Sequence, residues 1–230
     1  MESCVICGCV KNCEQHLEKV FENIAKIQKL FGETKIIISF DISTDFSLKK
    51  LCELKKTFDI EIIINKNPLT NIRTVNIENA RNKILDMIYE KYASWDYFIM
   101  IDMDDVSAKP IYIESLSNEL NKNDEWDALF FNNENYYDFW ALCFDDFQYS
   151  CWHSNNARKL INIMNKEFQK KLKNNNEYIE CQSAFGGFGI YKTKKFKNSR
   201  YRSLIDISLF NIENLQNIYN KYQIQYMINN

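Results

Sequence analysis

The chain has 230 residues, enough for one α/β domain with a well-buried core but short for two. Hydrophobic residues make up 46% of it and charged residues 26%, which are globular values that argue against disorder. The formal net charge is −2, with Lys and Arg spread along the chain, so we expect no nucleic-acid partner, while a small anion held through a metal ion stays open.

Neither a secretory leader nor a membrane span is predicted. The apolar run at the start is short and has no basic flank, unlike a signal peptide. A transmembrane helix needs about 18 consecutive apolar residues, and the sequence offers no such run. We therefore expect a cytoplasmic protein in a reducing environment.

The first half alternates strand and helix patterns. Strands are expected at 3–10, 34–40, 60–65 and 97–101, and helices at 43–58 and 76–91. Another helix is expected after Asn12, whose side chain can cap an amphipathic stretch that reaches Leu30. Continuous apolar strands between helices indicate a parallel sheet covered on both faces. The resulting layout is Rossmann-like, with ligands at the carboxyl ends of the strands.

The second half is less regular and rich in aromatic residues. A helix is expected at 154–173, a glycine-containing segment at 181–191, and a helix-like stretch at 212–224. The sequence shows neither an internal repeat nor a linker between separate domains.

Four of the eight Cys residues stand close to the start of the chain, at Cys4, Cys7, Cys9 and Cys13. Their spacing does not match the paired knuckles of a zinc site, and no second pair follows. A buried strand explains them better, because free Cys packs as a small hydrophobe. Metal or redox chemistry is the alternative.

An acidic cluster follows the fourth expected strand directly. On an extended backbone Asp102 and Asp104 point to the same side, where two carboxylates repel unless a proton or cation lies between them. Carboxylate oxygens suit Mn²⁺ or Mg²⁺, which keep positions open for phosphate oxygens. A solvated acidic turn is the plainer interpretation.

The cluster has two other interpretations. A calcium loop starting at Asp102 needs Gly and Glu where Ser107 and Ile113 stand, so it is excluded. The pattern Asp-x-Asp-x-Val also resembles the nucleophile motif of haloacid-dehalogenase-type phosphatases. In those enzymes the motif closes the first strand, whereas three strands are expected before it here.

A wider set of motifs resembles the GT-A glycosyltransferases, in particular a group found in giant DNA viruses and in some fungi and protists. The matching segments, in the expected order, are Asn79-Ala80-Arg81-Asn82, 97–105, 126–130, 137–142 and 183–192. The resemblance implies a metal-dependent hexosyltransferase with a nucleoside-diphosphate sugar as donor and a glycan or other hydroxyl compound as acceptor. It implies one GT-A domain over 1–230, with a donor half at 1–105, an acceptor half at 106–192 and a divergent tail at 193–230.

By this resemblance Asp104 bridges the metal to the diphosphate, and Asp102 lies nearer the ribose or sugar. Arg81 lies near the donor phosphates, which its guanidinium can hold in bidentate fashion. A surface ion pair of Arg81 with Glu78 or Asp86 is the alternative. Further donor-side candidates are Arg73, Gly8, Cys9 and Asp41.

On the acceptor side, Trp140 and Trp152 offer flat faces that can stack on sugar rings, although aromatics at this density also form cores. Gly186 and Gly187 let a backbone approach a ligand closely, or simply form a turn.

The pattern departs from the family at its end. In the family, a Glu-His pair near the end of the domain supplies a further metal ligand. This sequence has no counterpart of it, since no His follows Lys192 and its two His residues are His16 and His153. Asp145 and Asp146 are the predicted catalytic bases, with Asp138 and Glu180 as further choices. A phosphatase using Asp102 and a non-catalytic GT-A-fold binding module are the rival functions.

Overall fold

The computed structural model describes residues 2–66, 70–131, 136–174 and 178–227. Two compact units divide the chain: unit 1 comprises residues 1–129 and 187–203, and unit 2 comprises residues 130–186 and 204–230. The expected single domain with its donor half, acceptor half and tail stays a prediction.

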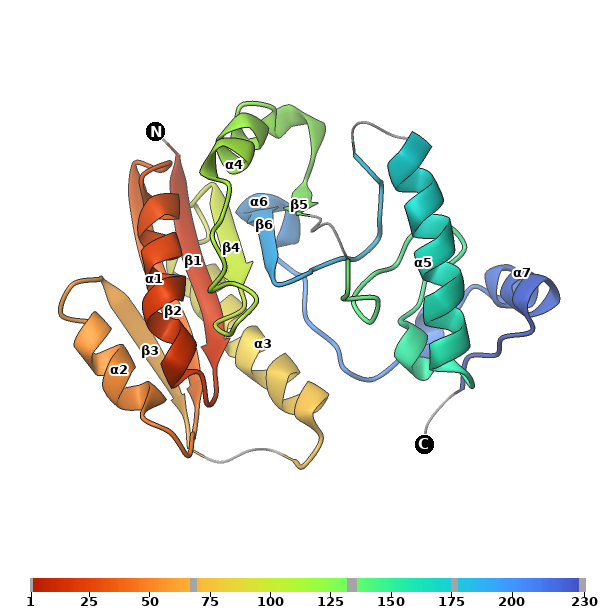
Figure 1. Ribbon diagram of the computed structural model, residues 1–230, viewed down its shortest axis with the longest axis horizontal. Helices are drawn as coiled ribbons and strands as arrows, with labels where there is room; N and C mark the ends of the chain where they lie inside the picture. The colour runs from red at the N-terminus through yellow and green to blue at the C-terminus, as the bar shows by residue number, and fades with distance from the viewer. Residues whose placement is uncertain (1, 67–69, 132–135, 175–177, 228–230) are drawn as a thin grey trace. The chain divides into compact units, whose positions relative to one another are not determined.

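A six-stranded sheet in the order β3-β2-β1-β4-β6-β5 forms the centre of unit 1 (Figure 1). Its strands are β1 (Ser3–Val10), β2 (Glu33–Asp41), β3 (Ile60–Asn65), β4 (Tyr97–Ile101), β5 (Ala128–Phe130) and β6 (Phe188–Lys192). The pairs β1–β2, β2–β3 and β1–β4 are parallel, and β6 runs antiparallel to β4. The prediction of a mostly parallel, Rossmann-like α/β sheet is confirmed.

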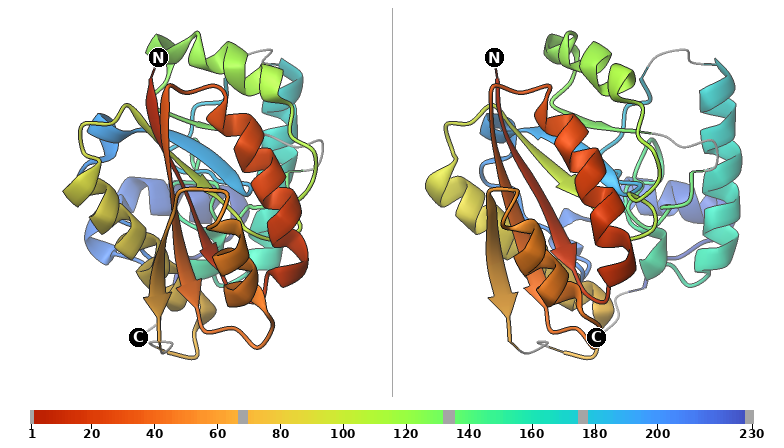
Figure 2. Two further views of the ribbon diagram at one scale, coloured as in Figure 1. Left: turned by 90° about the vertical axis from the view of Figure 1, so that its left-hand side faces the viewer. Right: turned by 60° about the vertical axis from the view of Figure 1, so that its left-hand side comes forward.

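Helices cover both faces of this sheet. The helices of unit 1 are α1 (Glu14–Gln28), α2 (Ser47–Leu54), α3 (Arg73–Lys91), α4 (Ile113–Leu120) and α6 (Thr193–Phe196), with a short 3-10 turn at Asn123–Glu125. α1 and α2 lie on one face and α3 on the other (Figures 1 and 2). Right-handed crossovers produce this division, because the chain adds β2 and β3 on one side of β1 and then returns to place β4 on the other.

The core of unit 1 comes from the expected apolar runs. Leu17, Val20 and Ile24 on α1 are fully buried, as are Cys4 and Cys7 on β1. All eight Cys residues are free thiols. The interpretation of the first cysteines as part of a buried strand is confirmed, because burying small apolar side chains on both faces is typical of a central parallel strand.

The start of α1 differs from the expectation. Asn12 has a φ of 54° and its Oδ1 accepts from the Thr44 amide at 2.8 Å, so it does not cap the helix. Asp45 does so instead, since its Oδ2 accepts from the Glu14 amide at 3.0 Å and its Oδ1 from the Ser47 amide at 3.0 Å. One carboxylate thus serves the first turns of both α1 and α2.

Three other helix bounds also differ. α2 is shorter than 43–58, because the residues before Ser47 form the loop that carries the shared cap. α3 begins at Arg73 rather than near 76. α5 (Ala157–Asn174) starts after Asn156, whose Oδ1 accepts from the Lys159 amide at 3.0 Å.

Unit 2 packs mainly around α5. Its other elements are two 3-10 turns, η2 (Cys151–His153) and η3 (Ile207–Leu209), and α7 (Ile212–Tyr222), which ends where Gln223 adopts a left-handed φ of 55°. The core contains Phe139, Leu142, Phe144, Phe147, Cys151, Leu160, Met164, Phe168, Ile218 and Ile224. Among the described residues, no helix is both long enough and apolar enough to span a bilayer.

Candidate functional site

Asp102 lies at the carboxyl end of β4, directly after five buried residues. Its amide donates to the Gly187 carbonyl at 2.8 Å, which holds the chain beside the start of β6. β1 and β4 are adjacent parallel strands, and the chain order reverses between them, because β2 and β3 follow on the opposite side of β1. In open α/β sheets this switch point is where ligands bind.

Asp104 begins the turn that follows. Its Oδ1 accepts from the Val106 amide at 3.1 Å, and its carbonyl accepts from the Ala108 amide at 3.1 Å. Between the two aspartates, Met103 is buried while both carboxylates are partly exposed. This alternation is what an extended backbone produces.

The missing side chain of Gly8 makes room for Met103. A Cβ at Gly8 would lie 2.5 Å from the Ile101 carbonyl oxygen and 2.7 Å from the Met103 sulfur. The buried Met103 therefore fills the space that a side chain at position 8 would need. The role of Gly8 on the donor side stays a prediction beside this packing role.

Arg81 reaches the site from α3. Its Nη2 lies 3.2 Å from Asp102 Oδ1, and the exposed fractions of the two side chains are 17% and 31%. Its guanidinium carbon also lies 5.1 Å from the centre of the Tyr201 ring. The two residues of the alternative surface pairing have other partners, since Glu78 accepts from Ser203 and Asp86 pairs with Arg200.

Arg81 stays protonated in this partly buried position. Burial alone would lower its pKa, but the neighbouring Tyr201, Asp102 and Cys9 more than offset this and raise it. For the Cys9 thiol, burial outweighs the nearby Arg81 and raises the pKa to about 12. Cys9 is therefore a neutral thiol at physiological pH and not a nucleophile.

A second polar network joins the ends of β2 and β3. Asp41 and Asn65 are paired in the register of the two strands. The Asn65 amide donates to Asp41 Oδ1 at 2.8 Å and to Ser39 Oγ at 2.9 Å, and its oxygen accepts from Lys83 Nζ at 2.7 Å. Asp41 was expected near the donor, whereas Asn65 and Lys83 were missed.

Arg81 and Lys83 stand on opposite sides of the buried stripe of α3. Ala80 and Ile84 form that stripe and are almost fully buried. Arg81 reaches the end of β4 on one side, and Lys83 reaches the end of β3 on the other. Arg73, the weaker candidate, is exposed in the first turn of α3, about 12 Å from Arg81 along the helix axis.

The residues at the end of β4 suit one kind of metal ion. Within the described parts of the chain, no three His, Cys, Asp or Glu side chains gather as a metal-binding group. Two carboxylates without a third protein ligand fit a hard cation that fills its shell with water and phosphate oxygens, as Mg²⁺ does. They do not fit a structural zinc ion, which needs four protein ligands.

In unit 2, the two predicted acceptor tryptophans form a stacked pair. The ring centres of Trp140 and Trp152 lie 4.4 Å apart at 30°, and the residues are 46% and 50% exposed. Ser150 links them, since its Oγ donates to the Trp140 carbonyl at 2.8 Å and accepts from the Trp152 amide at 3.4 Å. The two tryptophans thus keep exposed surface, whereas Phe139 and Phe144 of the same unit are buried.

The two predicted catalytic bases lie in unit 2 and are bound to lysines. Asp145 Oδ2 is 2.8 Å from Lys171 Nζ, and Asp146 Oδ2 is 3.4 Å from Lys221 Nζ. Asp145 also has a left-handed φ of 46°, which non-glycine residues adopt rarely.

Gly186 and Gly187 form a turn with φ values of 72° and 89°. Asp138, another candidate base, accepts from the Gly186 amide at 3.2 Å within unit 2. Within unit 1, the Gly187 carbonyl also accepts from the Ser107 hydroxyl at 3.3 Å. The turn interpretation explains both glycines, because only glycine tolerates this backbone freely.

The two histidines belong to different units. His16 Nε2 contacts the Gln15 amide at 3.0 Å on the exposed side of α1. His153 belongs to unit 2, and burial lowers its pKa.

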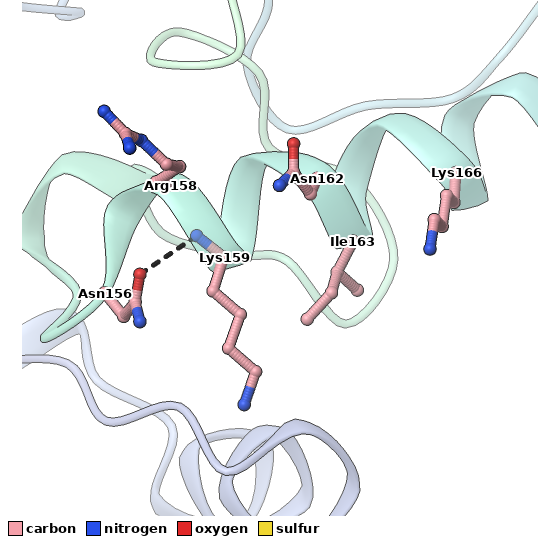
Figure 3. A pocket seen from close by; sticks show the side chains of 6 residues that line it. All are labelled: Asn156, Arg158, Lys159, Asn162, Ile163 and Lys166. Atoms are coloured by element: carbon pink, nitrogen blue, oxygen red, sulfur yellow. Dashed lines mark hydrogen bonds between the residues drawn. The ribbon is translucent and has the colours of Figure 1, made fainter.

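A separate basic hollow lies on α5 (Figure 3). Its lining residues are Asn156, Arg158, Lys159, Asn162, Ile163 and Lys166. They carry three positive charges and come from successive turns of one helix face, so the hollow is a feature of the helix surface.

No family model and no curated protein matches the sequence. Solved structures similar to the chain include S. aureus TarS 1-349, with a TM-score of 0.47 and 15% identity over 93% of this chain and 53% of that one. Glucosyl-3-phosphoglycerate synthase from Mycobacterium tuberculosis in complex with Mn²⁺, UDP and phosphoglyceric acid gives a TM-score of 0.48 and 14% identity, over 84% and 56%.

A third similar structure is the mannosyltransferase PcManGT from Pyrobaculum calidifontis in complex with GDP-Man and Mn²⁺. Its TM-score is 0.38 and its identity 14%, over 51% of this chain and 31% of that one. The chain thus spans 31–56% of the length of these three proteins.

Proposed function

We propose that this protein is a metal-dependent glycosyltransferase that moves a hexose from a nucleoside-diphosphate sugar to a glycan or other hydroxyl acceptor. The observation that carries the proposal is the arrangement at the end of β4, where Asp102 pairs with Arg81 at the switch point of the sheet and Asp104 follows two residues later. A carboxylate pair beside a partly buried guanidinium is suited to a diphosphate and its counterion. The resemblance of its motifs to those of GT-A glycosyltransferases supports the same function.

In this proposal Asp102 and Asp104 hold Mn²⁺ or Mg²⁺, which supplies positive charge against the departing nucleoside diphosphate. Arg81 donates to the diphosphate oxygens through its planar guanidinium. Asp41 lies at the end of β2 for the nucleoside, with its Oδ1 held by Asn65. Arg73 is a further contact for the donor, at the start of α3.

The acceptor side of the proposal uses residues of unit 2. Trp140 and Trp152 offer the exposed indole faces for a sugar ring, and the turn at Gly186 and Gly187 lets a ligand approach the backbone. Asp145 or Asp146 takes the proton of the acceptor hydroxyl. The acceptor oxygen then bonds to the anomeric carbon, while the bond from that carbon to the diphosphate breaks.

The decisive experiment is a thermal-shift series with UDP, GDP and their sugars, with and without Mn²⁺. A ligand at 100 times its Kd stabilises the folded state by about 2.7 kcal/mol, which is easily detected. We expect a metal-dependent shift with one nucleotide in the wild type and its loss in Asp104→Ala. Asp105→Ala is the matched control, because Asp105 is an exposed carboxylate in the same turn.

The outcomes separate the rival functions. Metal-dependent nucleotide binding that is unchanged in Asp104→Ala would contradict the proposed metal site. Tight binding of beryllium fluoride at Asp102 without any nucleotide binding would instead identify a phosphatase. Nucleotide binding with no hydrolysis or transfer from any nucleotide sugar would identify a binding module.

A further inference from the structure

A short segment after α6 lies along α3 and is tied to it at several points. This segment, residues 199–203, is called the strap here. Asn82 holds the strap through two backbone bonds, from its Nδ2 to the Tyr201 carbonyl at 3.0 Å and from the Tyr201 amide to its Oδ1 at 2.9 Å. One turn earlier on α3, Glu78 Oε2 accepts from the Ser203 amide at 2.8 Å and also from the Ser203 hydroxyl.

The strap is also tied at its other end. Arg200 pairs with Asp86 at 2.7 Å, and its guanidinium carbon lies 5.4 Å from the centre of the Tyr89 ring. Tyr89 in turn donates to the Phe196 carbonyl. Side chains from three successive turns of α3 therefore fix the course of the strap.

This anchoring places one aromatic ring against the candidate site. The Tyr201 ring lies 5.1 Å from the Arg81 guanidinium carbon, while the edge of the same guanidinium meets Asp102 Oδ1 at 3.2 Å. A long arginine side chain loses rotamer freedom worth about 2 kcal/mol when it is fixed. The aromatic ring on one side and the carboxylate bonded to Nη2 impose that order before any ligand arrives.

We infer that Tyr201 is a positioning residue, which holds the Arg81 guanidinium in the orientation that receives the diphosphate of the nucleotide donor. This inference rests on the proposed function. Ordering the group in advance lowers the entropic cost of binding, so the effect belongs to affinity for the diphosphate and not to global stability. Only the ring is needed, since the attraction between a cation and an aromatic face does not use the phenol oxygen.

The test compares Tyr201→Leu with Tyr201→Phe by isothermal titration of UDP and GDP in the presence of Mn²⁺. Tyr201→Leu is expected to lose about 3- to 30-fold in affinity for the nucleotide that binds, which corresponds to the usual strength of a cation–π contact. Tyr201→Phe keeps the ring and is expected to bind as the wild type does.

Tyr89→Leu is the matched control. It removes a ring that faces an arginine of the same strap on the same helix, but this arginine pairs with Asp86 and not with Asp102. A general loosening of the strap would weaken nucleotide binding in both leucine variants. Positioning of Arg81 weakens it in Tyr201→Leu alone.

Equal affinities in Tyr201→Leu and Tyr89→Leu would overturn the inference and leave the proposed function intact. Absence of nucleotide binding in the wild type would overturn the proposed function and the inference with it. If Tyr201→Leu does not fold, Tyr201→Met removes the ring at a similar volume, and wild-type affinity in that variant would overturn the inference as well.

Discussion

In unit 1 the buried side chains come from strands of five to nine residues and the helices that cover them, whereas in unit 2 they come from one long helix and the loops around it. The polar candidates differ in the same way. Arg81, Asp102, Asp41 and Asn65 are bonded in linked groups at the strand ends of unit 1. In unit 2 the two predicted bases, Asp145 and Asp146, each pair with a lysine. A regular sheet thus brings distant polar residues together.

The largest expected loss of stability comes from deleting a core side chain of unit 2. Phe144→Ala removes a fully buried ring, which costs about 3–5 kcal/mol. Because unit 2 has its own core, we expect hydrogen exchange to accelerate in α5 while the amides of β1 and β4 keep their protection. Equal loss of protection in the sheet would show that the two units unfold as one.

A smaller loss is expected from overfilling unit 1. Gly8→Ala places a Cβ 2.5 Å from the Ile101 carbonyl oxygen, so β1 and β4 must separate or Met103 must move. Overpacking of this kind costs about 1–3 kcal/mol, measurable by urea unfolding. Because Met103→Ala itself removes a buried side chain at a cost of about 2–5 kcal/mol, Gly8→Ala combined with Met103→Ala should lose less than the sum of the two single losses. Additive losses would argue against the clash with Met103.

The shared cap is expected to contribute less. Asp45→Ala leaves amides of α1 and α2 without their acceptor, at a cost of about 1–2 kcal/mol. Partial burial alone would raise the pKa of Asp45, but its bonds to Ser47 and Glu14 outweigh this and lower it.

The pH dependence of this effect has a fixed sign. A lowered carboxyl pKa stabilises the folded state above the unfolded pKa of about 3.9, and the stabilisation is lost as the pH falls through the folded pKa. The stability difference between the wild type and Asp45→Ala should therefore be full at neutral pH and shrink below about pH 4. A constant difference down to low pH would contradict the role of the ionised carboxylate.

The smallest effect concerns the exposed tryptophan pair. Stacking of Trp140 on Trp152 is expected to couple the two residues by about 0.5 kcal/mol in a double-mutant cycle, because both rings are half exposed. The Phe139–Phe168 pair is a buried comparison in the same unit. A coupling between the tryptophans that exceeds the one between the phenylalanines would contradict this order.

Local patterns predicted β1 to β4, because a continuous run of apolar residues leaves a strand few alternatives, whereas β5 and β6 were not predicted as strands. The helix starts were less accurate. Asn12 and Asp45 are both good capping residues, and only the approach of two loops decides that Asp45 provides the cap. Such a choice depends on tertiary contacts, which the local sequence does not contain.

The candidate site was predicted only in part, because some of its residues are joined by tertiary contacts that the local sequence does not contain. Asp102 and Arg81 could be named because one ends an apolar strand and the other lies on the preceding helix, in motifs that resemble a known family. Asn65 was missed, although the register of β2 and β3 pairs it with Asp41. Tyr201 lies 120 residues after Arg81 in an irregular segment, so no periodic pattern could connect the two.

The burial of the thiols has a practical consequence for chemical labelling. Of the eight cysteines only Cys52, on α2, is exposed, while Cys7 in the sheet and Cys151 beside α5 are buried. A maleimide dye should therefore attach at Cys52 of the native protein without any engineered substitution. Under denaturant, Cys7 and Cys151 should react later, as the units open. Mass analysis of the labelled peptides from one sample would then give the rate at which each unit opens.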